Sequence, residues 1–154
     1  MSMLRRFLVF QALLLWQGGF LFYAAFVIPT GTDVLGTFEQ GRVTRHVTNS
    51  MNVIGVVALT ILAWDQCFSG FRRLRWSLWV AMAGTVVALV WLHVLIESLV
   101  DFSPSGGFGD YPAFYFWHRV YLYVAAAQWV FGLVYVAVLI RDWDKSRPSM
   151  RGNI

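Results

Sequence analysis

Apolar residues fall into four long runs that are separated by short polar segments. The runs are Phe7 to Ile28, Val53 to Trp64, Trp76 to Val100 and Val120 to Ile140. A helix that crosses the hydrocarbon core of a bilayer needs about 20 mainly apolar residues. The pattern therefore predicts an all-α protein, an integral membrane four-helix bundle that forms one domain over residues 1–154. The predicted spans are residues 7–28, 47–67, 76–100 and 113–140.

The second and fourth spans must extend beyond their apolar runs. The second run is short, so its span includes polar residues such as Asn49 and Asn52, which need partners inside the bundle. The fourth helix is predicted to begin earlier, with Asp110 as N-cap and Pro112 in the first turn. Two connections, Thr30 to Gly41 and Asp101 to Tyr111, are expected to be loops, and the second, rich in glycine and serine, to be mobile.

Composition and charge support a membrane protein and give its orientation. Of the 154 residues, 58% are apolar or aromatic and 13% are charged, which is too little polar surface for a soluble domain. Nine of the twelve basic residues flank one side of the predicted spans: Arg5, Arg6, Arg72, Arg73, Arg75, Arg141, Lys145, Arg147 and Arg151. By the positive-inside rule both termini are then cytoplasmic. The basic residues form short flanks rather than a stripe on one face, so no nucleic-acid partner is expected.

Common catalytic motifs are absent from the sequence. There is no phosphate-binding glycine loop, no His-Glu-x-x-His and no Gly-x-Ser-x-Gly. The single cysteine, Cys67, cannot form an intramolecular disulfide and is expected to be buried or interfacial. The tail from Asp142 to Ile154 is expected to fray. The sequence favours a protein that is not an enzyme.

The most informative polar residues are His93 and Glu97 in the third span. Together with Asp101 they are spaced four residues apart and share one helix face. Ionisable groups inside a span are expensive in lipid and mark candidate functional sites. Glu97 is predicted to lie level with His118 of the fourth span, because the two helices are antiparallel. We expect Glu97 to accept a hydrogen bond from His118 or to pair with Arg119.

A ladder of polar residues leads into the second span. One interpretation is an interfacial helix start whose arginines meet lipid phosphates, and the other is that Arg42 or Arg45 reaches Glu97 or Asp101. The candidate polar cluster at this outer end contains Arg42, Arg45, His46, Asn49, Asn52, Glu97, Asp101 and Arg119. Gln17 and Gln128 are expected to pack against small residues in mid-membrane. All three histidines lie toward the outer side, and the cytoplasmic half is expected to be apolar.

Short motifs in the first and last spans carry a family resemblance. They are Gly18-Gly19-Phe20 with Phe26-Val27-Ile28-Pro29, and Phe116-Trp117-His118-Arg119-Val120-Tyr121-Leu122. The chain resembles the small four-helix membrane proteins of the DUF4149 or TMEM205-like kind, which are distantly similar to the copper-resistance protein D group. The resemblance implies a multi-pass protein of the bacterial inner (plasma) membrane with a histidine that opens the last helix, here His118. It implies no established activity.

Three functional hypotheses follow. The first is a structural or accessory membrane component that needs no cofactor and has the lipid bilayer, other membrane subunits or its own copies as partners. The second is a carrier of copper or haem b that uses His93 and His118 as ligands, since imidazoles on facing helices build such sites. The third is a quinone-linked redox subunit with a pocket at His93 and Glu97.

Overall fold

The first quarter of the chain forms one long helix with two wider turns. The computed structural model describes residues 3–69, 73–100 and 110–145. The first helix runs without interruption through α1 (Met3–Leu13), α2 (Gly19–Phe22) and α3 (Ile28–Leu35). Two single π-helical turns, η1 (Leu14–Gly18) and η2 (Tyr23–Val27), join these three segments. Such turns are typical of places where a helix accommodates an extra residue.

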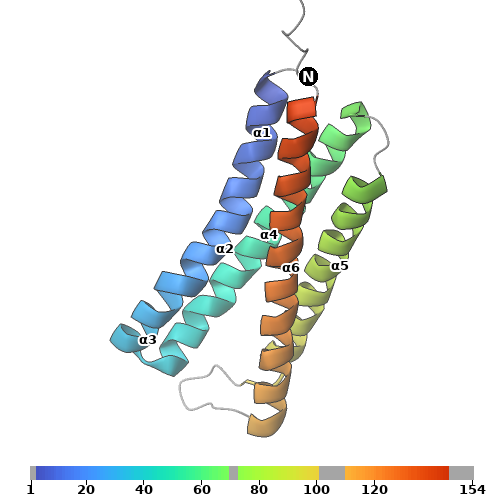
Figure 1. Cartoon of the computed structure of the whole chain (residues 1–154). Coiled ribbons are helices and arrows are strands. Elements are labelled where there is room, and N and C mark those ends of the chain that lie inside the picture. The colour runs from blue at the N-terminus through green and yellow to red at the C-terminus, as the bar shows by residue number, and fades with distance from the viewer. Residues whose placement is uncertain (1–2, 70–72, 101–109, 146–154) are drawn as a thin grey trace, which may run out of the picture.

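Three further helices complete the bundle (Figure 1). They are α4 (Thr37–Ser69), α5 (Arg73–Glu97) and α6 (Tyr111–Lys145). All four long helices have the length and the apolar composition needed to cross a membrane. They lie side by side, so the predicted helical bundle is confirmed. The described N-terminus and the end of α6 lie at the same end of the bundle, here called the terminal end, and the opposite end is called the distal end.

The connection predicted between Thr30 and Gly41 is helical rather than a loop. Pro29 lies in the first turn of α3, where its missing N–H and fixed φ are tolerated. Only Gly36 leaves the helix, with a φ of 83° that an L side chain rarely adopts. The first helix and α4 therefore form a hairpin with a one-residue turn at the distal end.

The other predicted boundaries have mixed outcomes. Asp110 caps α6 as expected, because its Oδ1 accepts a hydrogen bond of 3.0 Å from the backbone N–H of Ala113. The helix continues to Lys145, so the first part of the expected frayed tail is helical. The expected mobile connection at 101–109 and the tail at 146–154 lie outside the described residues. Cys67 is exposed, so the buried alternative is wrong, and the interfacial one stays a prediction.

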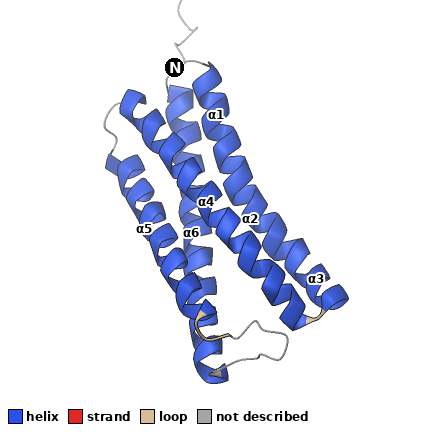
Figure 2. Ribbon diagram, turned by 180° about the vertical axis from the view of Figure 1, so that it is seen from behind, coloured by secondary structure: helices blue, strands red, loops and turns tan. Residues whose placement is uncertain are grey.

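The apolar core lies in the terminal half of the bundle. Its members come from all four helices and include Val9, Leu62, Met82 and Leu139, each at most 2% exposed. Helices approach closely where small residues allow it, and in this core Gly55 lies against the Trp16 indole. Toward the distal end the α3–α4 hairpin diverges from α5 and α6 (Figures 1 and 2). This divergence leaves space for a cavity.

Candidate functional site

A cavity of about 440 Å³ lies at the distal end, where the helices diverge. All four long helices contribute to its walls, which are mainly apolar or aromatic. Its polar lining includes Arg45 of α4, His93 and Glu97 of α5, and His118 and Tyr121 of α6. Ligand pockets typically have this size and this combination of apolar walls with a few convergent polar groups. The cavity is therefore the candidate functional site.

An ion pair between two helices forms the polar wall. Arg45 Nε lies 2.5 Å from Glu97 Oε1, which joins α4 to α5. His93 Nε2 lies 3.1 Å from the same oxygen, as the four-residue spacing on one helix face predicts. The Glu97 side chain is 24% exposed and that of Arg45 42% exposed, so solvent or a ligand can reach the pair. Of the two interpretations of the polar ladder, this contact supports the second, in which Arg42 or Arg45 reaches Glu97 or Asp101.

The imidazole ring of His118 is held by stacking on an aromatic ring and not by the ion pair. It stacks on Phe114 with 13° between the ring planes and 5.6 Å between the ring centroids. Within the described part of the chain, the partners of Glu97 are Arg45 and His93, so the expected pairing with His118 or Arg119 is wrong. Among the same residues no hydrogen bond to the His118 imidazole is present. An imidazole can donate and accept hydrogen bonds, and here it lines the cavity.

Most of the predicted ladder lies outside the cavity. Arg42 pairs weakly with Glu39 at 3.5 Å, and His46 and Asn49 are exposed. Asn52 is half-buried and does not line the cavity. The reason is helical geometry: an 11-residue stretch winds through about three turns, so only part of it can face the same neighbour. Arg119 is exposed, and Asp101 lies outside the described residues.

The ligand set does not favour a bound metal ion. Among the residues that the structure describes, no group of three His, Cys, Asp or Glu side chains could hold a metal ion. His93 is engaged with Glu97, and His46 is exposed and does not line the cavity. Ligation of haem b by His93 and His118 alone stays a prediction, for which a visible absorption spectrum of the purified protein is the measurement.

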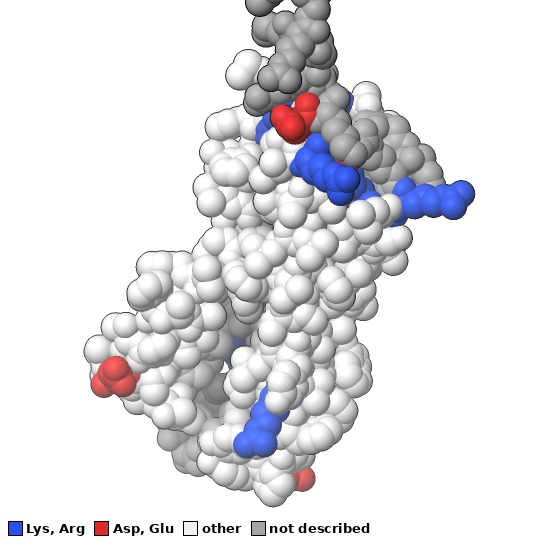
Figure 3. Space-filling model, in the orientation of Figure 1, with Lys and Arg blue, Asp and Glu red and all other residues white. Residues whose placement is uncertain are grey.

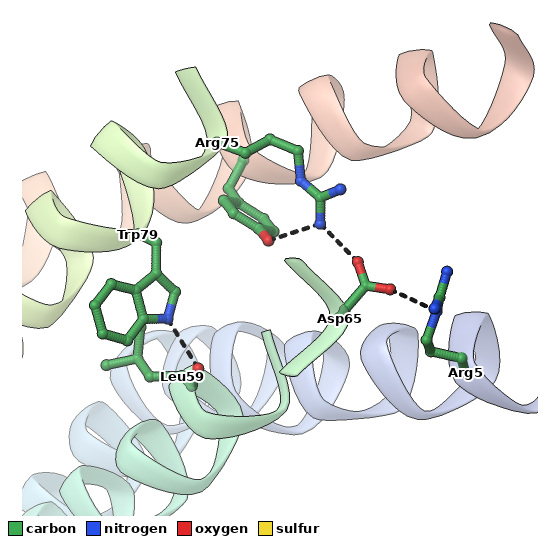
Figure 4. Close-up of polar contacts among 6 residues, drawn as sticks. Arg5, Leu59, Asp65, Arg75 and Trp79 are labelled. Carbon is green, nitrogen blue, oxygen red and sulfur yellow. Dashed lines mark hydrogen bonds and ion pairs between the residues drawn. The ribbon is translucent and has the colours of Figure 1, made fainter. Parts of the chain in front are cut away.

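A second charged cluster lies at the terminal end, in the half that was expected to be apolar. Asp65 of α4 is fully buried and accepts contacts from two arginines (Figure 4). Its Oδ2 lies 2.6 Å from Nη2 of Arg75, and its Oδ1 lies 3.0 Å from Nε of Arg5. Arg75 also donates a hydrogen bond of 3.1 Å to the hydroxyl of Tyr135. The expectation of an apolar half is therefore wrong.

This terminal cluster, Arg5, Asp65, Arg75 and Tyr135, takes one residue from each of the four long helices. Beside it, the Trp79 indole N–H donates a hydrogen bond of 2.8 Å to the carbonyl of Leu59. Two arginines of the cluster had been interpreted as topology signals in short loops. The signal that could have identified the cluster is Asp65 itself, an acidic residue next to the apolar run of the second span.

Comparison with known proteins adds no further assignment. No match to this chain was found among protein-family models, curated protein sequences or solved structures. The resemblance to the DUF4149 group stays a prediction. The cavity and the two clusters are therefore the features of this chain that bear on its function.

Proposed function

We propose that this chain is an integral membrane protein with four transmembrane helices and with both termini in the cytoplasm. The support is the length and apolarity of the four helices and the wide apolar belt between the charged ends (Figure 3). Large apolar side chains are exposed along this belt, for example Val87 at 70% and Val94 at 61%. Exposed apolar surface on this scale needs lipid or a partner to cover it. The positive-inside rule and the family resemblance support the bacterial inner membrane.

The orientation can be tested with the single native cysteine removed. In a Cys67→Ser background, Glu39→Cys places a thiol at the distal end and Asp144→Cys places one at the terminal end. A membrane-impermeant maleimide added to intact cells is expected to label the first and to label the second only after permeabilisation. The reverse labelling pattern would overturn the proposed orientation.

For the biochemical role, we propose an accessory membrane protein that binds a small lipid-soluble molecule in the distal cavity. The observation that carries this proposal is the mainly apolar cavity with the pair of Arg45 and Glu97 in its wall. Partners of the lipid-exposed helices would be other membrane subunits or further copies of the chain.

Extraction of the purified protein tests the binding role. Organic extracts of protein in lipid nanodiscs, analysed by mass spectrometry, are expected to contain a small molecule enriched over empty nanodiscs. Leu122→Trp, which fills the cavity from its wall, is expected to abolish the enrichment. His46→Phe changes an exposed residue of α4 outside the cavity and is the control. Equal enrichment in the wild type and Leu122→Trp would contradict the proposal.

A purely structural role is the second candidate, and the terminal cluster favours it. Arg5, Asp65, Arg75 and Tyr135 tie all four helices together at one end. If the protein only supports a larger assembly, cavity-filling Leu122→Trp will leave that assembly intact in affinity purification from native membranes. Substitutions of Asp65 will disrupt it.

A further inference from the structure

The distal cavity opens sideways, between the first helix and α6. The residues that line it on this side include Ala24 and Ile28 of the first helix and Phe114 and Leu122 of α6. At this end α3 packs on α4, whereas α6 packs on α5. Figure 3 shows the surface hollowed between these two pairs of helices. In a bilayer this opening faces the lipid, so a molecule dissolved in the membrane could enter without crossing water.

The polar residues of the cavity wall lie inward from the distal end of the bundle, toward its middle. Arg45 is eight residues from the start of α4 and His118 seven from the start of α6. At 1.5 Å per residue these positions are about 10–12 Å from the helix starts. Leu122, one turn deeper than His118, is 52% exposed. A ligand would therefore place its polar head at the interface and an apolar chain toward the bilayer centre.

The charges of the wall cancel. Arg45 and Glu97 form a direct pair, and His93 contacts the same carboxylate. With neutral histidines, the charged residues that line the described cavity sum to zero. An ionic head group would lose its hydration without a spare countercharge, which is costly in an apolar site. The wall therefore favours an uncharged head group.

His118 adds to the cavity a hydrogen-bonding group that the other described residues leave unused. Its imidazole stacks on Phe114, which fixes the ring plane, and it has no hydrogen-bond partner among the described residues. A carbonyl or hydroxyl oxygen is the simplest group that this N–H can bind. The aromatic rings of Phe38, Phe114 and Tyr121 line the same space and would pack against a flat ring.

We propose that the distal cavity binds a neutral membrane-soluble molecule of the quinone type, with His118 donating a hydrogen bond to one of its oxygens. The molecule enters from the bilayer between the first helix and α6, and its chain stays in that opening. This inference depends on the proposed ligand-binding role of the cavity. It assigns binding only and includes no electron-transfer step.

Three probes with the same decyl chain separate head-group classes. They are a decyl benzoquinone, decanoate and decyltrimethylammonium, each titrated into nanodiscs with and without protein. The quinone is expected to bind at least about tenfold more tightly than either ion, which corresponds to about 1.4 kcal/mol. Tighter binding of decanoate than of the quinone would overturn the neutral head group and leave the proposed cavity function standing. No saturable binding of any probe, together with no enriched natural molecule, would overturn both the quinone-type ligand and the proposed ligand-binding function.

Variants of His118 test its hydrogen bond. His118→Phe is expected to weaken quinone binding about tenfold, the effect of one hydrogen bond. His118→Gln retains a donor and is expected to recover part of the affinity. His46→Phe, the same substitution at an exposed position, is expected to leave binding unchanged. Unaltered affinity in a folded His118→Phe protein would overturn the role of His118, and thermal unfolding of each variant checks folding.

Discussion

The two charged clusters of this bundle pair arginine with a carboxylate in different surroundings. At the terminal end, Asp65 is 0% exposed and Arg75 is 2% exposed. At the distal end, Glu97 is 24% exposed and Arg45 is 42% exposed. Charge pairs are screened where water or a cavity is near, and removal of one partner is far more costly where the site is dry. The comparison separates a cluster that fixes the fold from one that remains accessible.

The clusters also differ in how many helices they join. Arg5, Asp65, Arg75 and Tyr135 link all four long helices, whereas Arg45 and Glu97 link only α4 and α5. Polar contacts therefore join all four long helices at the terminal end, whereas the first helix and α6 are separated at the distal end. A stable end and an open end are what a lateral binding site requires.

The largest expected effect comes from the terminal cluster. Asp65→Asn keeps the side-chain size but leaves Arg5 and Arg75 without their buried carboxylate. We expect a loss of about 3–5 kcal/mol in the free energy of unfolding, the usual cost of breaking a buried pair. Denaturant titration in micelles, followed by tryptophan fluorescence, measures it. Glu39→Gln is the control, because its side chain is 56% exposed, and a loss under about 1 kcal/mol for Asp65→Asn would show that the terminal cluster is not structural.

An intermediate loss of stability is expected from a substitution at Gly55, between the two clusters. Gly55 lies ten residues from both Arg45 and Asp65 on α4, and a Cβ there would lie 2.8 Å from the Trp16 indole nitrogen. Because Trp16 is a rigid ring that is only 4% exposed, Gly55→Ala is expected to cost about 1–3 kcal/mol through overpacking.

Gly84→Ala is the matched control for that substitution. A Cβ at Gly84 meets no atom within 4 Å, and alanine favours helices by up to about 1 kcal/mol over glycine. We expect unchanged or slightly raised stability in the same unfolding measurement. If both glycine variants behave alike, the close contact of the first helix with α4 is not what holds this region together.

The smallest effect on stability is expected at the distal cluster. Glu97→Gln should lower the unfolding free energy by less than about 1 kcal/mol, because the pair with Arg45 is partly exposed. The same variant removes the negative charge of the pair while Arg45 keeps its positive charge, so the cavity wall becomes net positive and the preference should shift from the neutral probe toward decanoate. A stability loss equal to that of Asp65→Asn would remove the distinction between the two clusters.

The sequence predicted the distal end better than the terminal end. The contact of His93 with Glu97 follows from helix spacing, and the Asp110 cap follows from the residues around Pro112. The contacts of Arg5 and Arg75 with Asp65 were not predicted, because a flanking arginine in sequence and a buried one in the fold have the same local pattern. Their common partner, Asp65, lies 60 and 10 residues away along the chain, and only the tertiary packing brings them together.

The other wrong prediction is the connection between the first two spans. The segment Thr30 to Gly41 was expected to be a loop, yet only Gly36 leaves the helix. Proline in a first turn and glycine within a long helix are both tolerated. The third hypothesis placed a pocket at His93 and Glu97, but the size and the other walls of the cavity could not be predicted, because they depend on the divergence of whole helices rather than on any motif.

The two π-helical turns decide where the first helix tolerates a change in length. Each turn holds one residue more than an α-helical turn would, so the helix contains two accommodated insertions. Deletion of exposed Leu15 from the first of them would restore an α-helical turn and leave the residues on both sides in register. Deletion of Leu8 from α1 would instead rotate everything before it by about 100° and turn Arg5 away from Asp65. The π-helical turns are thus the places where this helix tolerates a change in length, and the α-helical segments are the places where its length aligns the terminal cluster.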